Sequence, residues 1–299
     1  MSQRLLVTGI HGQIAMALAE RAVLNGSFEI VALGRPQLDL ADPSTVGAAI
    51  EMASPDIIVS AAAHTAVDQA ESEEDLATRI NSLSAGEIAK AAHRLGVPVI
   101  QISTDYVFDG QKSTPYLEDD PVAPVSVYGR SKLAGEIAVR AATNEHVILR
   151  TAWVYSPFGK NFLKTMLRLA ETRENLSVVD DQIGNPTSAL DIADGILTVA
   201  SNLLSDQSRR LRGTFHMSGS GAASWADFAE EIFSHARLQN GPFATVTRIA
   251  TSDYPTPAKR PANSRLDCSR LRDLHGIVLP AWQSSTAQIV ERLIAELRA

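Results

Sequence analysis

The sequence contains a single cysteine, Cys268, among its 299 residues. One thiol cannot form an internal disulfide and excludes a metal site built from several cysteines, which suits a reducing compartment. No apolar run approaches the ~18 residues of a membrane-spanning helix. The N-terminal MSQRLLVTGI enters a short apolar strand directly, without the long apolar segment and cleavage site of a signal peptide. We therefore expect a soluble cytoplasmic protein without a membrane partner or a structural metal.

An excess of positive charge is also missing. The chain has 27 Lys and Arg against 34 Asp and Glu, a formal net charge of -7. Such a balance argues against a general nucleic-acid binder, which needs a basic surface to displace phosphate counterions. The segment 259–272 is locally basic, and it is either a patch for a small anionic ligand or a solvated face.

The composition, 45% hydrophobic and 20% charged, is that of a globular protein, and apolar strands alternate with helical segments along its first half. The expected strands are 4–10, 28–34, 55–63, 97–103 and 146–155, and the expected helices are 11–26, 85–96 and 131–142. Near-continuous apolar strands separated by helices are typical of a parallel sheet covered on both faces. The sequence therefore predicts an α/β protein with a doubly wound parallel sheet of Rossmann type.

Beyond residue 155 the pattern is less regular and indicates a second, smaller, mainly C-terminal lobe. It contains expected helices at 161–172, 189–204 and 224–237, and a strand at 213–219. Segment 240–266 carries four prolines without a clear period and is expected to be an ordered loop. We assign 1–155, with 175–220 returning to it, to the sheet domain, and 156–174 and 221–299 to the smaller lobe.

A glycine turn follows the first expected strand. In TGIHGQIA, residues 8–15, Gly9 permits a tight turn, Gly12 permits close approach of the backbone to a pyrophosphate, and Ala15 replaces the third glycine of the dinucleotide pattern. That third position serves helix packing, so alanine is tolerated. Its place between a strand and a helix favours nucleotide binding over a plain turn.

The end of the second strand, ALGR, indicates which nicotinamide cofactor binds. A carboxylate there would hold a ribose diol, whereas an arginine accommodates a 2'-phosphate. The strand ends in Arg35 with no acid, which favours NADPH, with NADH or an ordinary loop cation as alternatives. Asp39 and Leu40 either border the adenine or begin the next helix, for which Asp42 is a good N-cap.

The stretch SVYGRSKLAGE places Tyr128 and Lys132 four residues apart near the start of a helix, so both side chains share one face. A nearby ammonium lowers the pKa of a phenol from its ordinary value of about 10 and makes it a better proton donor. The alternative is an exposed tyrosine with Lys132 paired to Glu136. Ser103 and Thr104 end the preceding strand, at the sheet edge where ligands of such folds bind.

A Ser or Thr hydroxyl followed by Tyr-x-x-x-Lys resembles the extended short-chain dehydrogenase/reductase superfamily. Six motifs resemble, in order and over nearly the full chain, its dTDP-4-dehydrorhamnose reductase family: STDYVFDG, YGRSKLAGE, RTAWVY, KNF, DQIGNPTSALDIAD and RPANSRLD. The resemblance implies hydride delivery from NADPH to the C4 carbonyl of dTDP-4-dehydro-6-deoxy-L-mannose, which gives dTDP-L-rhamnose.

The resemblance also implies roles for individual residues. Tyr128 would protonate the forming alkoxide, Thr104 would bond the carbonyl oxygen, and Lys132 would bind the nicotinamide ribose and depress the phenol pKa. Asn81 would support the lysine through water. The implied cofactor contacts are Gly9, His11, Gly12, Gln13, Ile14, Arg35, Asp39, Leu40, Ala62, Ala63, Thr65, Tyr128 and Lys132. The implied substrate contacts are Thr104, Tyr106, Tyr128, Trp153, Asn161, Gln182, Thr187 and Arg260, with Tyr106 and Trp153 alternatively core aromatics.

Three positions depart from the family pattern. Ser60 and His64 stand where members often have Asn and Tyr, and we interpret His64 as loop variation rather than a base. Some members dimerise through a magnesium ion held by glutamates, and Ala17 stands where one such acid would fall. We therefore expect no metal, and a monomer or weak homodimer. The alternative functions are another nucleotide-sugar reductase or epimerase, or a non-catalytic subunit resembling the regulatory subunit of methionine adenosyltransferase.

Overall fold

The computed structural model describes residues 2–26 and 28–298, and its centre is a parallel sheet of six strands. The strands stand in the order β10, β5, β4, β3, β1, β2, and every neighbouring pair is parallel. Their bounds are β1 (Gln3–Thr8), β2 (Phe28–Leu33), β3 (Ile57–Ser60), β4 (Val99–Thr104), β5 (His146–Thr151) and β10 (Gly213–His216). Because β2 and β3 lie on opposite sides of β1, the winding reverses between β1 and β3. The predicted doubly wound sheet of Rossmann type is confirmed.

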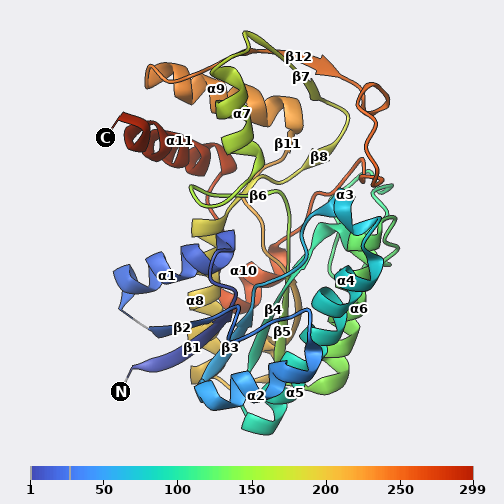
Figure 1. Ribbon diagram of the computed structural model, residues 1–299, viewed down its shortest axis with the longest axis vertical. Helices are drawn as coiled ribbons and strands as arrows, with labels where there is room; N and C mark the ends of the chain where they lie inside the picture. Colours follow the sequence, from blue (N-terminus) through green and yellow to red (C-terminus); the bar gives the residue numbers. More distant parts are fainter. Residues whose placement is uncertain (1, 27, 299) are drawn as a thin grey trace.

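Helices cover both faces of this sheet (Figure 1). One face carries α1 (Gln13–Asn25) and α8 (Ala189–Ser205), and the other carries α2 (Pro43–Ala53), α5 (Ser84–Leu95) and α6 (Val127–Ala142). Successive residues of a strand point to opposite faces. Leu5 and Val7 therefore pack with α1 and α8, while Leu6 packs with α2 and α5. Burial of both faces explains why these strands are apolar without alternation.

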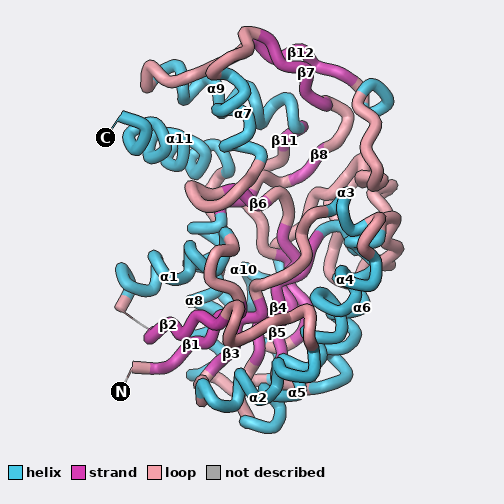
Figure 2. Tube along the Cα trace, viewed as in Figure 1, coloured by secondary structure: helices cyan, strands magenta, loops and turns pink. Residues whose placement is uncertain are grey.

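A smaller lobe stands at one end of the sheet, at the top of both views (Figure 1 and Figure 2). It contains α7 (Phe162–Ala170), α9 (Trp225–Leu238), α11 (Trp282–Arg298), and a parallel pair formed by β7 (Asn175–Val179) and β12 (Thr245–Ile249). Tyr155, Phe228 and Trp282 lie in its own apolar core. The lobe therefore has a core separate from those on the two faces of the sheet.

Short elements join the two parts. The strand β6 (Val154–Tyr155) pairs with β9 (Thr187–Ser188), and β8 (Ile183–Gly184) pairs with β11 (Ala223–Ser224). The helix α10 (Ser269–His275) packs on β10 and α8. Between β3 and α5 lie α3 (Val67–Ala70), α4 (Glu74–Thr78) and a π-helical turn, Arg79–Leu83, none of which we predicted from the sequence.

The structure shifts the predicted domain boundaries. We expected 175–220 to return to the sheet domain, but β7 pairs with β12, and Leu176 and Val178 pack in the core of the lobe. The return begins with α8, which packs on α1. Conversely, we expected 221–299 to lie in the smaller lobe, but Leu271 of α10 packs in the core between the sheet and the helices α1 and α8. Partner contacts rather than sequence order decide these assignments.

Two strands also differ from expectation. The predicted strand 146–155 is interrupted at Trp153, whose φ of 47° is incompatible with a continuous strand. The segment 240–266, predicted to be loop, contains β12, which pairs with β7. Val246 and Ile249 of this strand are only partly exposed. None of the helices within residues 2–26 and 28–298 has the length and apolar character needed to cross a membrane.

Candidate functional site

A cavity of about 1110 Å³ opens at the carboxyl ends of β1, β3 and β4, where the winding of the sheet reverses. Open α/β sheets bind their ligands at this position. The glycine turn after β1 and the loop after β3 line one part of the cavity, and the start of α6 and the loop after β6 line another. The cavity therefore lies between the sheet and the smaller lobe.

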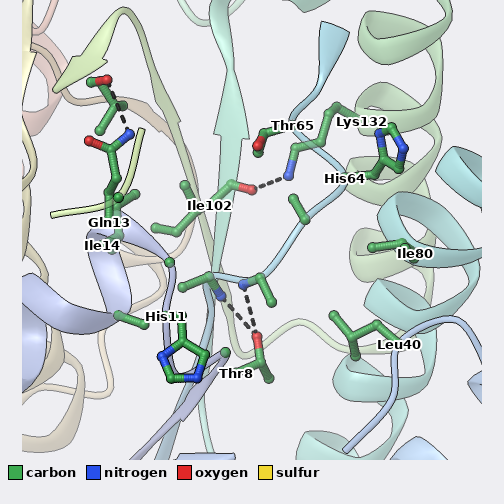
Figure 3. Close-up of a pocket in the computed structure, with 18 of the residues that line it drawn as sticks. Thr8, His11, Gln13, Ile14, Leu40, His64, Thr65, Ile80, Ile102 and Lys132 are labelled. Carbon is green, nitrogen blue, oxygen red and sulfur yellow. Dashed lines mark hydrogen bonds between the residues drawn. The ribbon is translucent and has the colours of Figure 1, made fainter. Parts of the chain in front are cut away.

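The glycine turn has the form needed to hold a pyrophosphate. Gly9 has a φ of 95°, and a Cβ there would lie 3.2 Å from the Cβ of Ala62. Gly12 caps α1 with extended backbone, which leaves the first amides of the helix facing the cavity end. The Thr8 hydroxyl accepts hydrogen bonds from the amides of Ala61 and Ala62, both at 3.1 Å (Figure 3). These two bonds tie the loop after β3 to the glycine turn.

Every cofactor contact that we predicted lies in the wall of this one cavity. His11, Gln13 and Ile14 follow Gly9 in the turn, and Ala62, Ala63 and Thr65 line it from the loop after β3. At its far end are Arg35, Asp39 and Leu40, where Asp39 accepts a hydrogen bond from the Ala41 amide at 2.9 Å. Arg35 is exposed and makes no ion pair within residues 2–26 and 28–298. Its guanidinium is therefore available to a phosphate.

The side chain of Gln13 is committed to the smaller lobe rather than to the cavity alone. Its Nε2 donates to the carbonyl of Val154 at 3.3 Å, as Figure 3 shows, and its Oε1 accepts from the Ser156 hydroxyl at 2.7 Å. Asn161, a predicted substrate contact that caps α7, also donates to Oε1, at 3.1 Å. Gln13 thus joins the glycine turn to the loop that closes the other side of the cavity.

The helix α6 brings Tyr128 and Lys132 into the cavity wall beside Thr104. Ser126 caps the helix by accepting a hydrogen bond from the Gly129 amide at 3.2 Å. A Cβ on Gly129 would clash with the carbonyl oxygen of Tyr106, so glycine lets α6 approach the loop after β4. The three side chains are almost fully buried and line the same cavity.

Burial dominates the electrostatics of this group. It lowers the pKa of Lys132 to about 8, which the Glu136 carboxylate offsets only in part. The ammonium donates to the carbonyl of Ile102 at 2.7 Å (Figure 3). Burial also raises the pKa of Tyr128, although the Thr104 side chain lowers it in part. The nearby Asp105 carboxylate raises the pKa of Tyr128 as well, so the phenol is neutral in this structure, and the expected depression of its pKa by Lys132 stays a prediction.

The alternative of an exposed Tyr128 with Lys132 paired to Glu136 is wrong. Glu136 is fully buried and holds Arg150 through two hydrogen bonds of 2.9 and 2.8 Å. It also accepts from the Ser103 hydroxyl at 2.6 Å. Sequence reasoning missed this pair, although an arginine inside the apolar strand HVILRT was a signal that a buried partner must exist.

Asn81 joins the loop after β3 to α6. Its Oδ1 accepts from the amide of His64 at 2.8 Å, and its Nδ2 donates to the carbonyl of His64 at 3.1 Å. Nδ2 also donates to the Ser131 hydroxyl at 2.9 Å. Ser131 precedes Lys132, so Asn81 fixes the backbone beside the lysine. The His64 ring lies 3.1 Å from the Glu73 carboxylate, which is consistent with a role in the loop.

The predicted substrate contacts divide into two groups. Tyr106, Trp153 and Asn161 line the cavity together with Thr104 and Tyr128, whereas Gln182, Thr187 and Arg260 are not part of its wall. Thr187 is corrected to a structural residue: it is fully buried, donates to the carbonyl of Asn185 and accepts from the amide of Gly219. Arg260 is held by Asp68 at 2.8 Å.

An aromatic stack that the sequence did not reveal supports Trp153. Its ring lies parallel to that of Trp225, with centroids 3.5 Å apart. Gln182 accepts a hydrogen bond from the Trp225 indole at 3.2 Å and is thereby placed behind the stack. Trp153 lines the cavity and Trp225 does not, so the Trp225 ring backs the part of the wall that Trp153 forms.

Among the described residues, no group of three or more His, Cys, Asp or Glu side chains is arranged to hold a metal ion.

The chain is similar to known proteins over almost its whole length. The protein family described as RmlD substrate binding domain matches residues 3–295. A dTDP-4-dehydrorhamnose reductase from Sinorhizobium fredii is 55% identical over 293 residues, which cover 98% of each chain. A dTDP-4-dehydrorhamnose reductase from Escherichia coli K12 is 45% identical over 261 residues, 87% of this chain and 85% of that protein.

Solved structures agree with these sequence matches. The crystal structure of a dTDP-4-dehydrorhamnose reductase from Bacillus anthracis, in complex with NADP, superimposes with a TM-score of 0.89. The two chains are 36% identical, and their alignment covers 97% of this chain and 99% of the Bacillus anthracis chain.

Proposed function

The chain belongs to the RmlD substrate binding domain family, together with the dTDP-4-dehydrorhamnose reductases, and we propose that Tyr128, Lys132 and Thr104 carry out its reaction. This reaction is the NADPH-dependent reduction of the C4 carbonyl of dTDP-4-dehydro-6-deoxy-L-mannose to dTDP-L-rhamnose. The observation that carries the proposal is the convergence of these three buried side chains on the cavity that the glycine turn also lines. The predicted family membership is confirmed.

The residues of the cavity fit NADPH. The positive φ of Gly9 and the capping backbone of Gly12 form a cradle for a pyrophosphate, and Arg35 at the far end supplies a cation for the 2'-phosphate. When bound, NADPH supplies the hydride. We assign Ala62, Ala63 and Thr65 to the opposite wall of the cofactor site.

The protein side of the reaction is proton delivery and positioning. Tyr128 donates its phenolic proton to the oxygen that becomes the C4 hydroxyl, and Thr104 orients the carbonyl beside it. Lys132 stabilises the phenolate left behind, because its ammonium is charged when the pH is below its pKa of about 8. A buried cation in a low-dielectric wall acts more strongly on this phenolate than it would in water.

Substrate turnover tests the function itself. When dTDP-4-dehydro-6-deoxy-L-mannose is added, we expect one NADPH to be oxidised for each sugar reduced. The loss of absorbance of the reduced nicotinamide measures this oxidation. A protein that binds NADPH but does not turn over this sugar would support the regulatory alternative. Conversion of the sugar without net NADPH oxidation would support an epimerase.

Arg35 is expected to set the preference for NADPH. Replacing it with alanine removes the cation available to the 2'-phosphate, so KM for NADPH should rise about 10-fold while KM for NADH stays nearly unchanged. Steady-state kinetics with both cofactors measure the difference. Arg272→Ala on α10 is the matched control, because Arg272 pairs with Asp273 outside the cavity. An equal effect of Arg35→Ala on both cofactors would refute this role.

We also propose a cytoplasmic location and a monomer or weak homodimer. The single cysteine, Cys268, is free and suits a reducing compartment. Ala17 is fully buried, and it offers no ligand for the metal-dependent dimer known in the family.

A further inference from the structure

Asp105 follows Thr104 directly and is the one carboxylate bonded to a proposed catalytic group among the described residues. The Thr104 hydroxyl donates to its Oδ1 at 2.8 Å. The carboxylate is almost fully buried, lines the cavity, and has a second oxygen, Oδ2, with no hydrogen-bond partner in the described chain. A buried carboxylate with an unpartnered oxygen is costly as an anion, so its retention beside the reacting group requires an explanation.

The single proton of the Thr104 hydroxyl creates a conflict with the proposed role of this residue. A threonine oxygen carries one proton to donate and two lone pairs to accept. Thr104 gives the proton to Asp105 and accepts from the Tyr106 amide at 3.2 Å. In this arrangement it offers only a lone pair to the cavity. A substrate carbonyl oxygen is itself an acceptor. Thr104 therefore cannot donate to it while the Thr104 proton is hydrogen-bonded to an ionised Asp105 carboxylate.

We propose that Asp105 is a positioning residue which sets the direction of the Thr104 hydroxyl, and that the protonated carboxyl is the competent form. Protonated Asp105 donates to the Thr104 oxygen, which frees the Thr104 proton to point at the substrate carbonyl beside Tyr128. Asp105 keeps its own proton throughout, and the proton added to the product still comes from Tyr128. The inference rests on the proposed function, because it explains how Thr104 binds the carbonyl.

The surroundings of Asp105 favour its protonated form at a higher pH than is usual for an aspartate. Burial raises the pKa of Asp105 to about 6, against the opposing influence of the Thr104 hydroxyl. Tyr128 on α6 and Tyr106 in the same turn lie close to Asp105, and burial raises the pKa of both phenols and keeps them neutral. Lys132, which lines the same cavity, donates to the carbonyl of Ile102. Arg260, on the loop of Ser264, is paired with Asp68. No cation in the described chain forms an ion pair with Asp105.

The pH profile of kcat/KM tests the inference. For the wild type, kcat/KM should fall about 10-fold per pH unit above pH 6, because this parameter reports the free enzyme. In kcat the same decline should move to higher pH, since a bound carbonyl favours the protonated carboxyl. In Asp105→Asn, whose amide can donate to Thr104 at every pH, the decline near pH 6 should disappear. The decline caused by Lys132 near pH 8 should remain in both proteins.

Thr104→Val is the second variant. It removes the hydroxyl, so its residual activity should also lack the decline near pH 6, and adding Asp105→Asn to it should change nothing further. Persistence of that decline in either Asp105→Asn or Thr104→Val would overturn the inference. NADPH affinity and the thermal unfolding midpoint of each variant, expected to match the wild type, show that it is folded.

An infrared titration keeps the inference testable independently of turnover. The difference between wild-type and Asp105→Asn spectra should contain a carboxylic-acid C=O band that is lost as pH rises through about 6. A carboxylate ionised throughout would overturn the inference. Absence of turnover in the wild type at every pH would instead count against the proposed function, so the two failures are distinguishable.

Discussion

Tyr128→Phe is expected to lower kcat by about 10² to 10⁴-fold, the range typical of a lost general acid. The substitution removes one oxygen from a ring that is 9% exposed, so packing against the Tyr106 ring should persist. NADPH affinity should remain close to that of the wild type, because the glycine turn and Arg35 are untouched. Steady-state rates and a fluorescence titration with NADPH measure the two quantities.

The matched control for this variant is Tyr116→Phe. Tyr116 is also buried, but it stacks on Phe108 and donates its hydroxyl to Asp109, outside the cavity. Its loss should leave kcat nearly unchanged and cost about 1 kcal/mol of stability. A fully active Tyr128→Phe enzyme would mean that the proton comes from another group.

Arg150→Met is expected to lower the free energy of unfolding by about 3 to 5 kcal/mol, because it leaves the Glu136 carboxylate buried without its main partner. Arg150 is 2% and Glu136 0% exposed, so water cannot replace the lost hydrogen bonds. Denaturant unfolding measures the change. Since Glu136 also binds Ser103, next to Thr104, activity should fall as well.

A surface arginine and a double variant provide the controls for Arg150→Met. Arg248 meets Asp180, Asp227 and Glu230 at 2.6 to 2.8 Å, but its side chain is 40% exposed. Arg248→Met should therefore cost less than about 1 kcal/mol. Replacing Glu136 and Arg150 together by apolar residues should cost less than Arg150→Met alone. If Arg150→Met were no more destabilising than Arg248→Met, the buried pair would not hold α6 to the sheet.

The sequence predicted the sheet because its strands are buried on both faces. Residues such as Leu5, Leu6 and Val7 all face apolar neighbours, so each strand forms an uninterrupted apolar run that is easily recognised. Strand β12 escaped prediction because it is short and mostly exposed, and only its partner β7 defines it. For the same reason, we placed β7 in the sheet domain, although it pairs with β12 in the smaller lobe. Strands that pair across a long stretch of sequence leave no local pattern.

The candidate site was predictable wherever its residues share one element. Tyr128 and Lys132 lie on one helix face, and Gly9 and Gly12 lie in one turn, so their spacing indicates a common role. The bonds from Thr104 to Asp105 and from Gln13 to Ser156 depend on side-chain direction and on tertiary contact. The same holds for Thr187, which lies within a motif of the family but is enclosed by Asn185 and Gly219.

The central claim is that hydride from NADPH reaches C4 of the nucleotide sugar in this cavity. Transfer of deuterium from NADPH dideuterated at the nicotinamide C4 position tests it most directly, with the product analysed by NMR and mass spectrometry. We predict one deuterium at C4 of the rhamnose ring and none elsewhere, with the second deuterium retained at C4 of the oxidised nicotinamide. A product without deuterium, or with deuterium at another ring carbon, would contradict the assignment of this chain as a C4 reductase.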